Sequence, residues 1–327
     1  MMINALDRLL GGLNERAIRP GLDNIAEVME RCGNPQRKFF SLHIAGTDGK
    51  GATAAICESV LRHAGFRVAR YTSPHLISIN ERFWIDGETA SDEQLNDAAE
   101  SILACSPEKL SYFERLTAVA FKLFADSGVQ IAVVETGLGG RLDATNLVTP
   151  SISVITRIGL DHTDILGGTI EEIAGEKSGI IKKGSAVVCA KMPFEARAVI
   201  MRQAENMSAR FVSVPETVSV GASARTLKGQ KISLSTWTRD LSGIKFPLAG
   251  SFQLENAATA AAALEIVHDA GIELTDAAFR LGYQNVNWPG RFDLINENPP
   301  VIVDGAHNPC AAEALLEALR SCGVKRK

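Results

Sequence analysis

The sequence predicts an α/β fold: a P-loop-type parallel sheet with helices on both faces. The first observation is that short apolar runs alternate with helical patterns along most of the chain. A strand that is covered on both faces is apolar along its whole length, so this alternation indicates a parallel sheet. The expected strands are 39–44, 68–71, 129–134, 152–155, 186–189 and 301–303. The expected helices between them are 51–64, 91–104, 112–126, 169–176 and 194–206.

The second observation is a glycine-rich turn between the first strand and its helix, which reads Gly46-Thr47-Asp48-Gly49-Lys50-Gly51 and is followed by Ala52. Backbone N–H groups in such a turn and at a helix start face an anion, and a lysine adds a full charge. A strict phosphate loop reads G-x-x-x-x-G-K-[ST], whereas here the spacing is shorter and a glycine stands in the hydroxyl position. The alternative is a glycine-rich turn with a solvated lysine.

The third observation is that polar residues follow the other strands. Ser73 comes after 68–71, Glu135 ends 129–134, and His162 lies between two aspartates after 152–155. Ligands of parallel sheets bind beyond the carboxyl ends of the strands, so these residues are expected at one edge. A carboxylate at a strand end holds Mg²⁺ in nucleotide enzymes. The alternatives are an exposed glutamate, a structural histidine and ordinary turn chemistry for the serine.

Spacing alone assigns no function to three further residues. Lys177 would be a solvated lysine at a helix end, and Arg291 and Asp304 would be linker and turn residues.

The second half of the chain changes character. Residues 215–249 predict a few antiparallel strands, 254–270 an alanine-rich helix, and 287–290 a turn and linker. The strand 301–303 and a helix from about Cys310 to Arg320 resemble the opening of a second, Rossmann-like α/β domain. We therefore expect a central domain over residues 1–288 and a truncated second domain over 289–327.

Composition narrows the class of protein. The chain has 327 residues, 46% of them apolar and 22% charged, with a net charge of −4. This indicates a globular protein, argues against nucleic-acid binding and leaves no run long enough to span a membrane. Six cysteines without a C-x-x-C pair indicate free thiols in a reducing cytoplasm rather than disulfides. We expect a cytoplasmic monomer.

Several motifs together resemble one family. They are HIAGTDGKGAT, TSPHL, NERFWIDG, LSYFE, VVETGLGGRLDATN, GLDHTDILGGTIEEIAGEKSGIIKKG, LENAATA, WPGRFD and DGAHNP, in this order. Their sequence and order are similar to those of the folylpolyglutamate synthase and dihydrofolate synthase family, which belongs to the Mur-ligase-like ATP-dependent amide ligases. The similarity extends from about Arg19 to the end of the chain.

The resemblance implies a role for each matching residue. Gly46 to Ala52, with Lys50 as the catalytic cation, match the ATP phosphate loop, and Asn256, Arg291, Asp304 and His307 match the late nucleotide motifs. Ser73, Glu135 and His162 match Mg²⁺ positions, with His162 also counted among the catalytic residues. Lys177 matches a catalytic lysine that is carbamylated in the family. Ser111, Tyr112, Phe113, Glu114 and Leu142 match segments that line the pterin site.

The resemblance also implies the reaction, which is ATP- and Mg²⁺-dependent ligation of L-glutamate to dihydropteroate or to the γ-carboxyl of a folate through an acyl phosphate. Asp48 and Ala52 depart from the family loop GTNGKGS, in which asparagine and serine are usual, and Thr136 replaces a usual valine. Two alternatives stay open at this point: a nucleotide- or pterin-binding remnant without turnover, and a cell-wall Mur-type ligase. LSYFE and GLGGRLDATN favour the folate branch over the latter.

Overall fold

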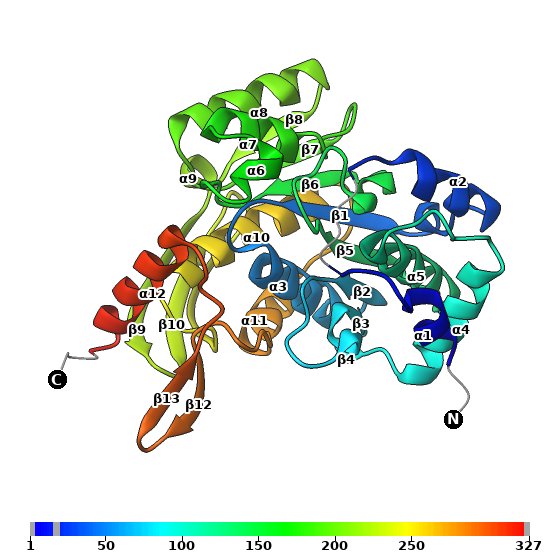
Figure 1. Cartoon of the computed structure of the whole chain (residues 1–327). Coiled ribbons are helices and arrows are strands. Elements are labelled where there is room, and N and C mark those ends of the chain that lie inside the picture. The colour runs from blue at the N-terminus through cyan, green and yellow to red at the C-terminus, as the bar shows by residue number, and fades with distance from the viewer. Residues whose placement is uncertain (1–3, 16–19, 324–327) are drawn as a thin grey trace.

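The computed structural model describes residues 4–15 and 20–323, and its centre is an eight-stranded sheet (Figure 1). The strands are β1 (Phe40–Ala45), β2 (Val68–Tyr71), β3 (Phe83–Ile85), β4 (Glu88–Thr89), β5 (Ile131–Glu135), β6 (Ile152–Ile155), β7 (Ala186–Cys189) and β8 (Arg210–Ser213). Their order is β4-β3-β2-β5-β1-β6-β7-β8. In this order, each neighbouring pair from β2 through β5, β1, β6 and β7 to β8 is parallel. Strands β3 and β4 pair antiparallel and extend the sheet beyond β2. The predicted parallel sheet is confirmed.

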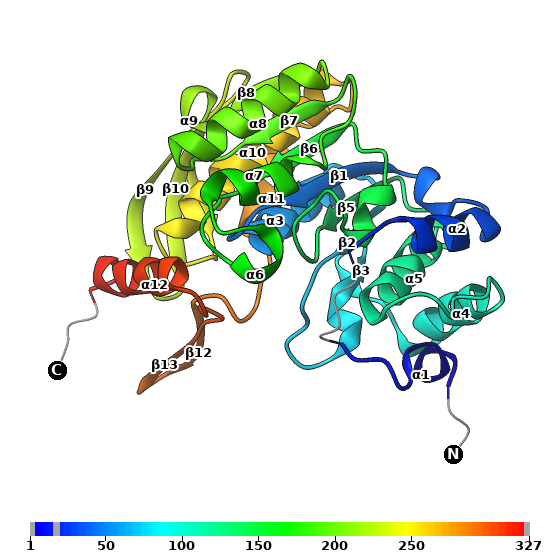
Figure 2. The same ribbon diagram turned by 45° about the horizontal axis from the view of Figure 1, so that its top comes forward.

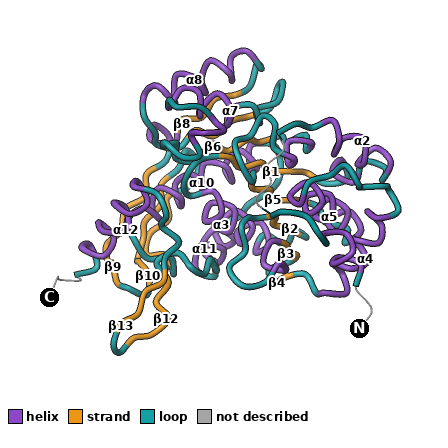
Figure 3. The backbone as a smooth tube through the Cα atoms, in the orientation of Figure 1, coloured by secondary structure: helices purple, strands orange, loops and turns teal. Residues whose placement is uncertain are grey.

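Helices cover both faces of this sheet because side chains alternate along each strand. In β5, Ile131 and Val133 enter one core while Ala132 and Val134 enter the other. The first face packs on α3 (Lys50–His63), α10 (Phe252–Asp269) and α11 (Asp276–Gln284). The second face packs on α1 (Ala5–Leu10), α2 (Asp23–Arg31), α4 (Asp92–Leu103), α5 (Tyr112–Asp126), α7 (Ile170–Ser178) and α8 (Phe194–Asn206). Figure 3 shows helices on both sides of the strands.

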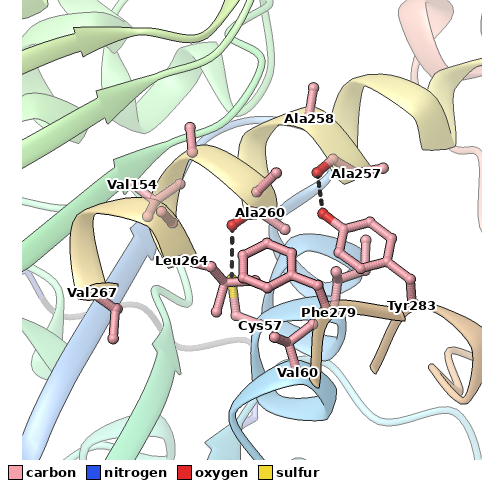
Figure 4. Packing of buried hydrophobic residues seen from close by; sticks show 14 of the residues in the cluster. Cys57, Val60, Val154, Ala257, Ala258, Ala260, Leu264, Val267, Phe279 and Tyr283 are labelled. Carbon is pink, nitrogen blue, oxygen red and sulfur yellow. Dashed lines mark hydrogen bonds between the residues drawn. The ribbon is translucent and has the colours of Figure 1, made fainter. Parts of the chain in front are cut away.

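Helix α10 is buried along most of its length because its alanines allow α3 to approach closely, and α11 packs on α3 in turn. Tyr283 of α11 donates its hydroxyl proton to the carbonyl of Ala257, at 2.6 Å, and stacks on Phe279 (Figure 4). This packing fixes the start of α10, which faces the end of β1, relative to the sheet.

The antiparallel strands predicted over 215–249 form a separate three-stranded sheet. It contains β9 (Ser219–Thr226), β10 (Gly229–Ser235) and β11 (Asp240–Phe246), and its apolar side chains, including Ile232 and Leu234, join the core around α10. The short helices α6 (Thr163–Leu166) and α9 (Val214–Thr217) lie in connections.

The last described segment forms a hairpin and a helix that extend from the rest of the molecule (Figure 2). The predicted strand 301–303 is present as β13 (Pro300–Val303), but it pairs antiparallel with β12 (Asp293–Glu297), a strand that the sequence did not predict. Helix α12 (Pro309–Ser321) follows, and its Ala318 packs against Phe292 and Ala249. The division of the chain between residues 288 and 289 stays a prediction.

The expectation of free thiols was wrong for one pair of cysteines. Cys32, which ends α2, and Cys105, just after α4, form a disulfide with their Cα atoms 5.9 Å apart. They are 73 residues apart in the sequence, so only the packing of α2 and α4 around α5 brings them together. Cys57 and Cys189 are free and buried, as expected, and Cys322 is free and half-buried. In the described ranges no helix is long and apolar enough to cross a bilayer.

Candidate functional site

The carboxyl ends of four neighbouring strands, in the order β2-β5-β1-β6, open into a cavity of about 1200 Å³. The polar residues that follow the strands were expected at this edge. Every predicted site residue lines the cavity: Gly46, Thr47, Asp48, Gly49, Lys50, Gly51, Ala52, Ser73, Ser111, Tyr112, Phe113, Glu114, Glu135, Leu142, His162, Lys177, Asn256, Arg291, Asp304 and His307. The individual roles assigned to these residues remain predictions.

The glycine-rich turn is held between the ends of β1 and β6. The N–H of Thr47 donates to the carbonyl of Arg157, at 2.8 Å. Gly46 has φ +151°, and a Cβ atom there would lie 1.8 Å from Oγ1 of Thr156, so only glycine fits. Lys50 begins α3, and its ammonium donates to the carbonyls of Gly46 and Thr47, both at 3.1 Å. The half-buried lysine is therefore held close to the loop by these two hydrogen bonds.

Glu135 is buried at the end of β5, and Ser73 lies beside it. The Oε2 atom of Glu135 accepts a hydrogen bond from the N–H of Ser73, at 3.1 Å. Burial raises the pKa of Glu135, and the nearby charge of Lys50, the Ser73 N–H and the charge of Arg291 oppose that rise. The structure thus brings together two of the three predicted metal positions, and an exposed glutamate is excluded.

Lys177 was expected to be solvated if spacing alone were considered, but it is buried. Helix α7 directs its side chain back to the glycine-rich turn, where Nζ donates to the carbonyl of Gly46, at 2.8 Å. Burial first, and the positive charge of Lys50 second, lower the pKa of this amine from 10.5 to about 7. A large fraction of Lys177 is therefore uncharged at neutral pH, and the neutral amine is a nucleophile.

His162 precedes α6 with φ +48°, and its side chain is half exposed. Its Nε2 lies 3.9 Å from Oδ1 of Asp161, which also accepts the backbone N–H of His162. The histidine reaches the cavity from β6, on the opposite side of β1 from Glu135.

The donor atoms of this site fit a hard cation. Glu135 supplies a buried carboxylate and Ser73 a hydroxyl, both oxygen ligands that Mg²⁺ prefers, whereas the imidazole of His162 is a softer donor. Among the described residues no cluster of three or more histidine, cysteine or acidic side chains is placed to hold a metal. Few protein ligands are typical of Mg²⁺, which keeps waters and binds substrate phosphates.

The predicted pterin residues divide into two kinds. Ser111 and Glu114 cap α5, because Oε2 of Glu114 accepts both the N–H and the hydroxyl of Ser111, at 2.8 and 2.7 Å. Phe113 stacks on Tyr71 and lies against Gly137, where a Cβ atom would be 2.5 Å from its ring. The aromatic side chains thus form the wall, and the polar pair fixes the helix that carries them.

The residues of the late motifs approach the glycine-rich turn from the other side. The Oδ1 atom of Asn256 would lie 2.2 Å from a Cβ atom at Gly49, so the two segments touch. Asp304 accepts the N–H groups of Phe292 and Ala306, at 2.7 and 2.8 Å, and thereby shapes the turn around Arg291.

Arg82 and Trp288 are among the cavity-lining residues that had no predicted role. Arg82 is buried and donates to Glu15 and to Nδ1 of His75, at 2.7 and 2.9 Å. Trp288 lies against Gly51. Both occur inside motifs of the family resemblance, NERFWIDG and WPGRFD, but an ion-paired arginine and a packed tryptophan carry no local signal of their partners.

Comparison with known proteins gives three findings. The Mur ligase middle domain matches residues 44–264. A dihydrofolate synthase/folylpolyglutamate synthase of Bacillus subtilis is 40% identical over 312 residues, which cover 93% of this chain and 73% of that protein. Two solved structures are also similar. An FPGS–AMPPCP–folate complex has a TM-score of 0.92 at 32% identity, covering 97% of this chain and 80% of that one. The Escherichia coli FolC protein with DHPP and ADP has a TM-score of 0.87 at 32% identity, covering 99% and 75%.

Proposed function

The chain belongs to the folylpolyglutamate synthase and dihydrofolate synthase family of Mur ligases, and we propose that it uses ATP to ligate L-glutamate to dihydropteroate, to the γ-carboxyl of a folate, or to both. The observation that carries the proposal is the single cavity in which a glycine-rich turn, a buried carboxylate, a buried lysine and an aromatic wall meet. Each of these parts serves one step of such a ligation.

A carboxylate is a poor acyl donor and has to be activated. Its oxygen attacks the γ-phosphorus of ATP, ADP leaves, and an acyl phosphate forms. The amine of glutamate then attacks the acyl carbon, phosphate leaves, and the amine proton is released to solvent. Positioning and neutralisation of spreading negative charge dominate this kind of catalysis. The N–H groups of the turn and the ammonium of Lys50 would bind and orient the phosphates.

Glu135 and Ser73 would hold Mg²⁺, with His162 completing the set. When bound, Mg²⁺ neutralises phosphate charge and orients the phosphoryl group. The burial of Glu135 supports this role, because the charge of a buried carboxylate is unfavourable unless a cation compensates it.

Lys177 would act as a carbamate. Its neutral amine attacks CO₂, a C–N bond forms and one proton is released, which converts a cation into a carboxylate-like group beside the turn. The lowered pKa of about 7 supports this proposal because only the uncharged amine reacts.

Tyr112, Phe113 and Leu142 offer apolar surface in the cavity wall, and a pterin ring could stack on the flat faces of the two aromatic rings. The acceptor carboxylate would then extend toward the turn and the nucleotide.

Asp48 and Ala52, the two residues of the turn that depart from the family loop GTNGKGS, fit the proposal. Ala52 is buried in the first turn of α3, so the missing hydroxyl leaves an apolar contact rather than an unpaired polar group. Asp48 accepts a hydrogen bond from Nδ2 of Asn308, at 3.3 Å, and this links the turn to the start of α12. A monomeric, cytoplasmic enzyme remains our expectation.

The test is ATP- and Mg²⁺-dependent incorporation of labelled glutamate, with dihydropteroate and tetrahydrofolate as parallel acceptors. Incorporation with either acceptor would establish the ligase and identify its substrate. Nucleotide binding without incorporation would favour the binding remnant, and turnover only on UDP-linked muramyl substrates would favour the cell-wall branch.

A further inference from the structure

Arg70 lies beneath the cavity and has unusual surroundings. It is in β2, it is 1% exposed, and its Nε and Nη2 atoms have no hydrogen-bond partner among the described residues. It forms an ion pair with Glu58, with Nη1 and Oε2 3.7 Å apart. A buried cation with few hydrogen bonds is unfavourable unless other groups compensate.

Two tryptophan rings provide that compensation. The guanidinium carbon is 4.3 Å from the ring centroid of Trp84 and 5.3 Å from that of Trp288. Trp84 is the cross-strand partner of Arg70 in β3, and its indole N–H is fixed by the carbonyl of Glu81, at 2.9 Å. Trp288 belongs to the segment that leads to β12. Arg70 is thus the charged centre of a contact between the sheet and this distant segment.

The ring of Trp288 also lies on the glycine-rich turn. A Cβ atom at Gly51 would be 2.2 Å from Cζ2 of Trp288. This explains why the chain has glycine where a strict phosphate loop has serine or threonine: the indole fills the space that the side chain would need. Three residues after the ring, Arg291 enters the cavity, and its charge acts on Glu135.

We propose that Arg70 is a positioning residue for the nucleotide: with Trp84 it holds Trp288 on Gly51 and thereby fixes Arg291 over the phosphate end of the cavity. The proposal rests on the proposed use of ATP. It assigns Arg70 no contact with substrate, because Arg70 does not line the cavity and acts through Trp288.

The experiment measures the Kd of a non-hydrolysable ATP analogue by calorimetry for the wild type, Arg70→Met and Trp288→Leu. We expect both variants to bind about tenfold more weakly, because the loss of a desolvated cation–π contact is worth about that factor. The Kd of the acceptor should stay within about twofold, and Arg70→Lys, which keeps the charge, should recover part of the loss. Trp237→Leu is the matched control, since it removes the Arg210–Trp237 contact away from the cavity.

A spectroscopic readout separates positioning from general loss of structure. In a Trp237→Phe background, acrylamide should quench tryptophan emission more strongly in Arg70→Met than in its parent, because Trp288 is released. The proposal is wrong if nucleotide affinity is unchanged in folded Arg70→Met and Trp288→Leu, or if affinities for nucleotide and acceptor fall equally. If the wild type binds nucleotide but incorporates no glutamate, only the proposed function fails, because the affinities still test Arg70. A wild type that binds no nucleotide overturns both.

Discussion

On one side of the cavity, Glu135 and Lys177 are each 4% exposed and project from the sheet edge and from α7. On the other side, Arg291 and Asp304 are half-buried and His307 is exposed. The first side is set by the hydrophobic core of the sheet, whereas the second is held by a few polar contacts and by Trp288. Substitutions on the core side should therefore change the chemistry, and substitutions on the late-motif side should change nucleotide affinity.

The largest effect is expected for Lys177→Met. Removing a buried charge-bearing group that contacts the turn should lower kcat by a factor on the order of 100 to 1000. The control is Lys182→Met, since Lys182 is also a partly buried lysine with a lowered pKa but bonds to Asn146 and does not line the cavity. Equal losses in both variants would contradict a specific role for Lys177.

The second-largest effect is expected for Glu135→Gln. The variant keeps the shape of the side chain but loses the charge, so the Mg²⁺ concentration that gives half-maximal activity should rise about tenfold or more. Glu265→Gln removes a buried carboxylate that pairs with Arg239 outside the cavity, and it should lower stability without changing the Mg²⁺ requirement. An unaltered Mg²⁺ titration for Glu135→Gln would refute the assignment.

The pH dependence of Lys177 gives a third test. In the folded protein the pKa of Lys177 is about 7, below its ordinary value of 10.5. Between pH 7 and pH 10.5 the unfolded chain therefore binds more protons at this residue than the folded chain does. The contribution of Lys177 therefore makes the free energy of unfolding rise with pH from about 7 to 10.5.

Carbamylation of Lys177 in bicarbonate should also increase as pH rises through about 7. Mass spectrometry of the intact protein should show one added CO₂ that Lys177→Met lacks.

The smallest effect concerns Asp48→Asn. Removal of a negative charge beside the phosphates should strengthen nucleotide binding about two- to fivefold. Asn308→Ala distinguishes the two functions of Asp48, because it breaks the hydrogen bond and keeps the charge. If both variants weaken binding, the contact with Asn308 matters more than the repulsion.

Prediction from the sequence succeeded where a pattern is local. β2, β6 and β7 have the predicted bounds, and β1 and β5 differ by one or two residues, because continuous apolar runs need only burial on both faces. Strand β12 was missed because the run Asp293–Glu297 is polar and is a strand only through pairing with β13. Helices α2 and α11 were missed as well, and their stability comes from packing on α5 and α3.

The sequence by itself determined the sheet, the glycine-rich turn and the polar residues at four strand ends, since each depends on neighbouring residues. The tertiary structure decided the state of those residues. Burial makes Lys177 a partly neutral amine, and strand order places Ser73 beside Glu135. Folding also brings Cys32 to Cys105 and Trp288 to Arg70. Such contacts join residues far apart in the chain, and burial and strand order are properties of the whole fold, so no local pattern encodes them.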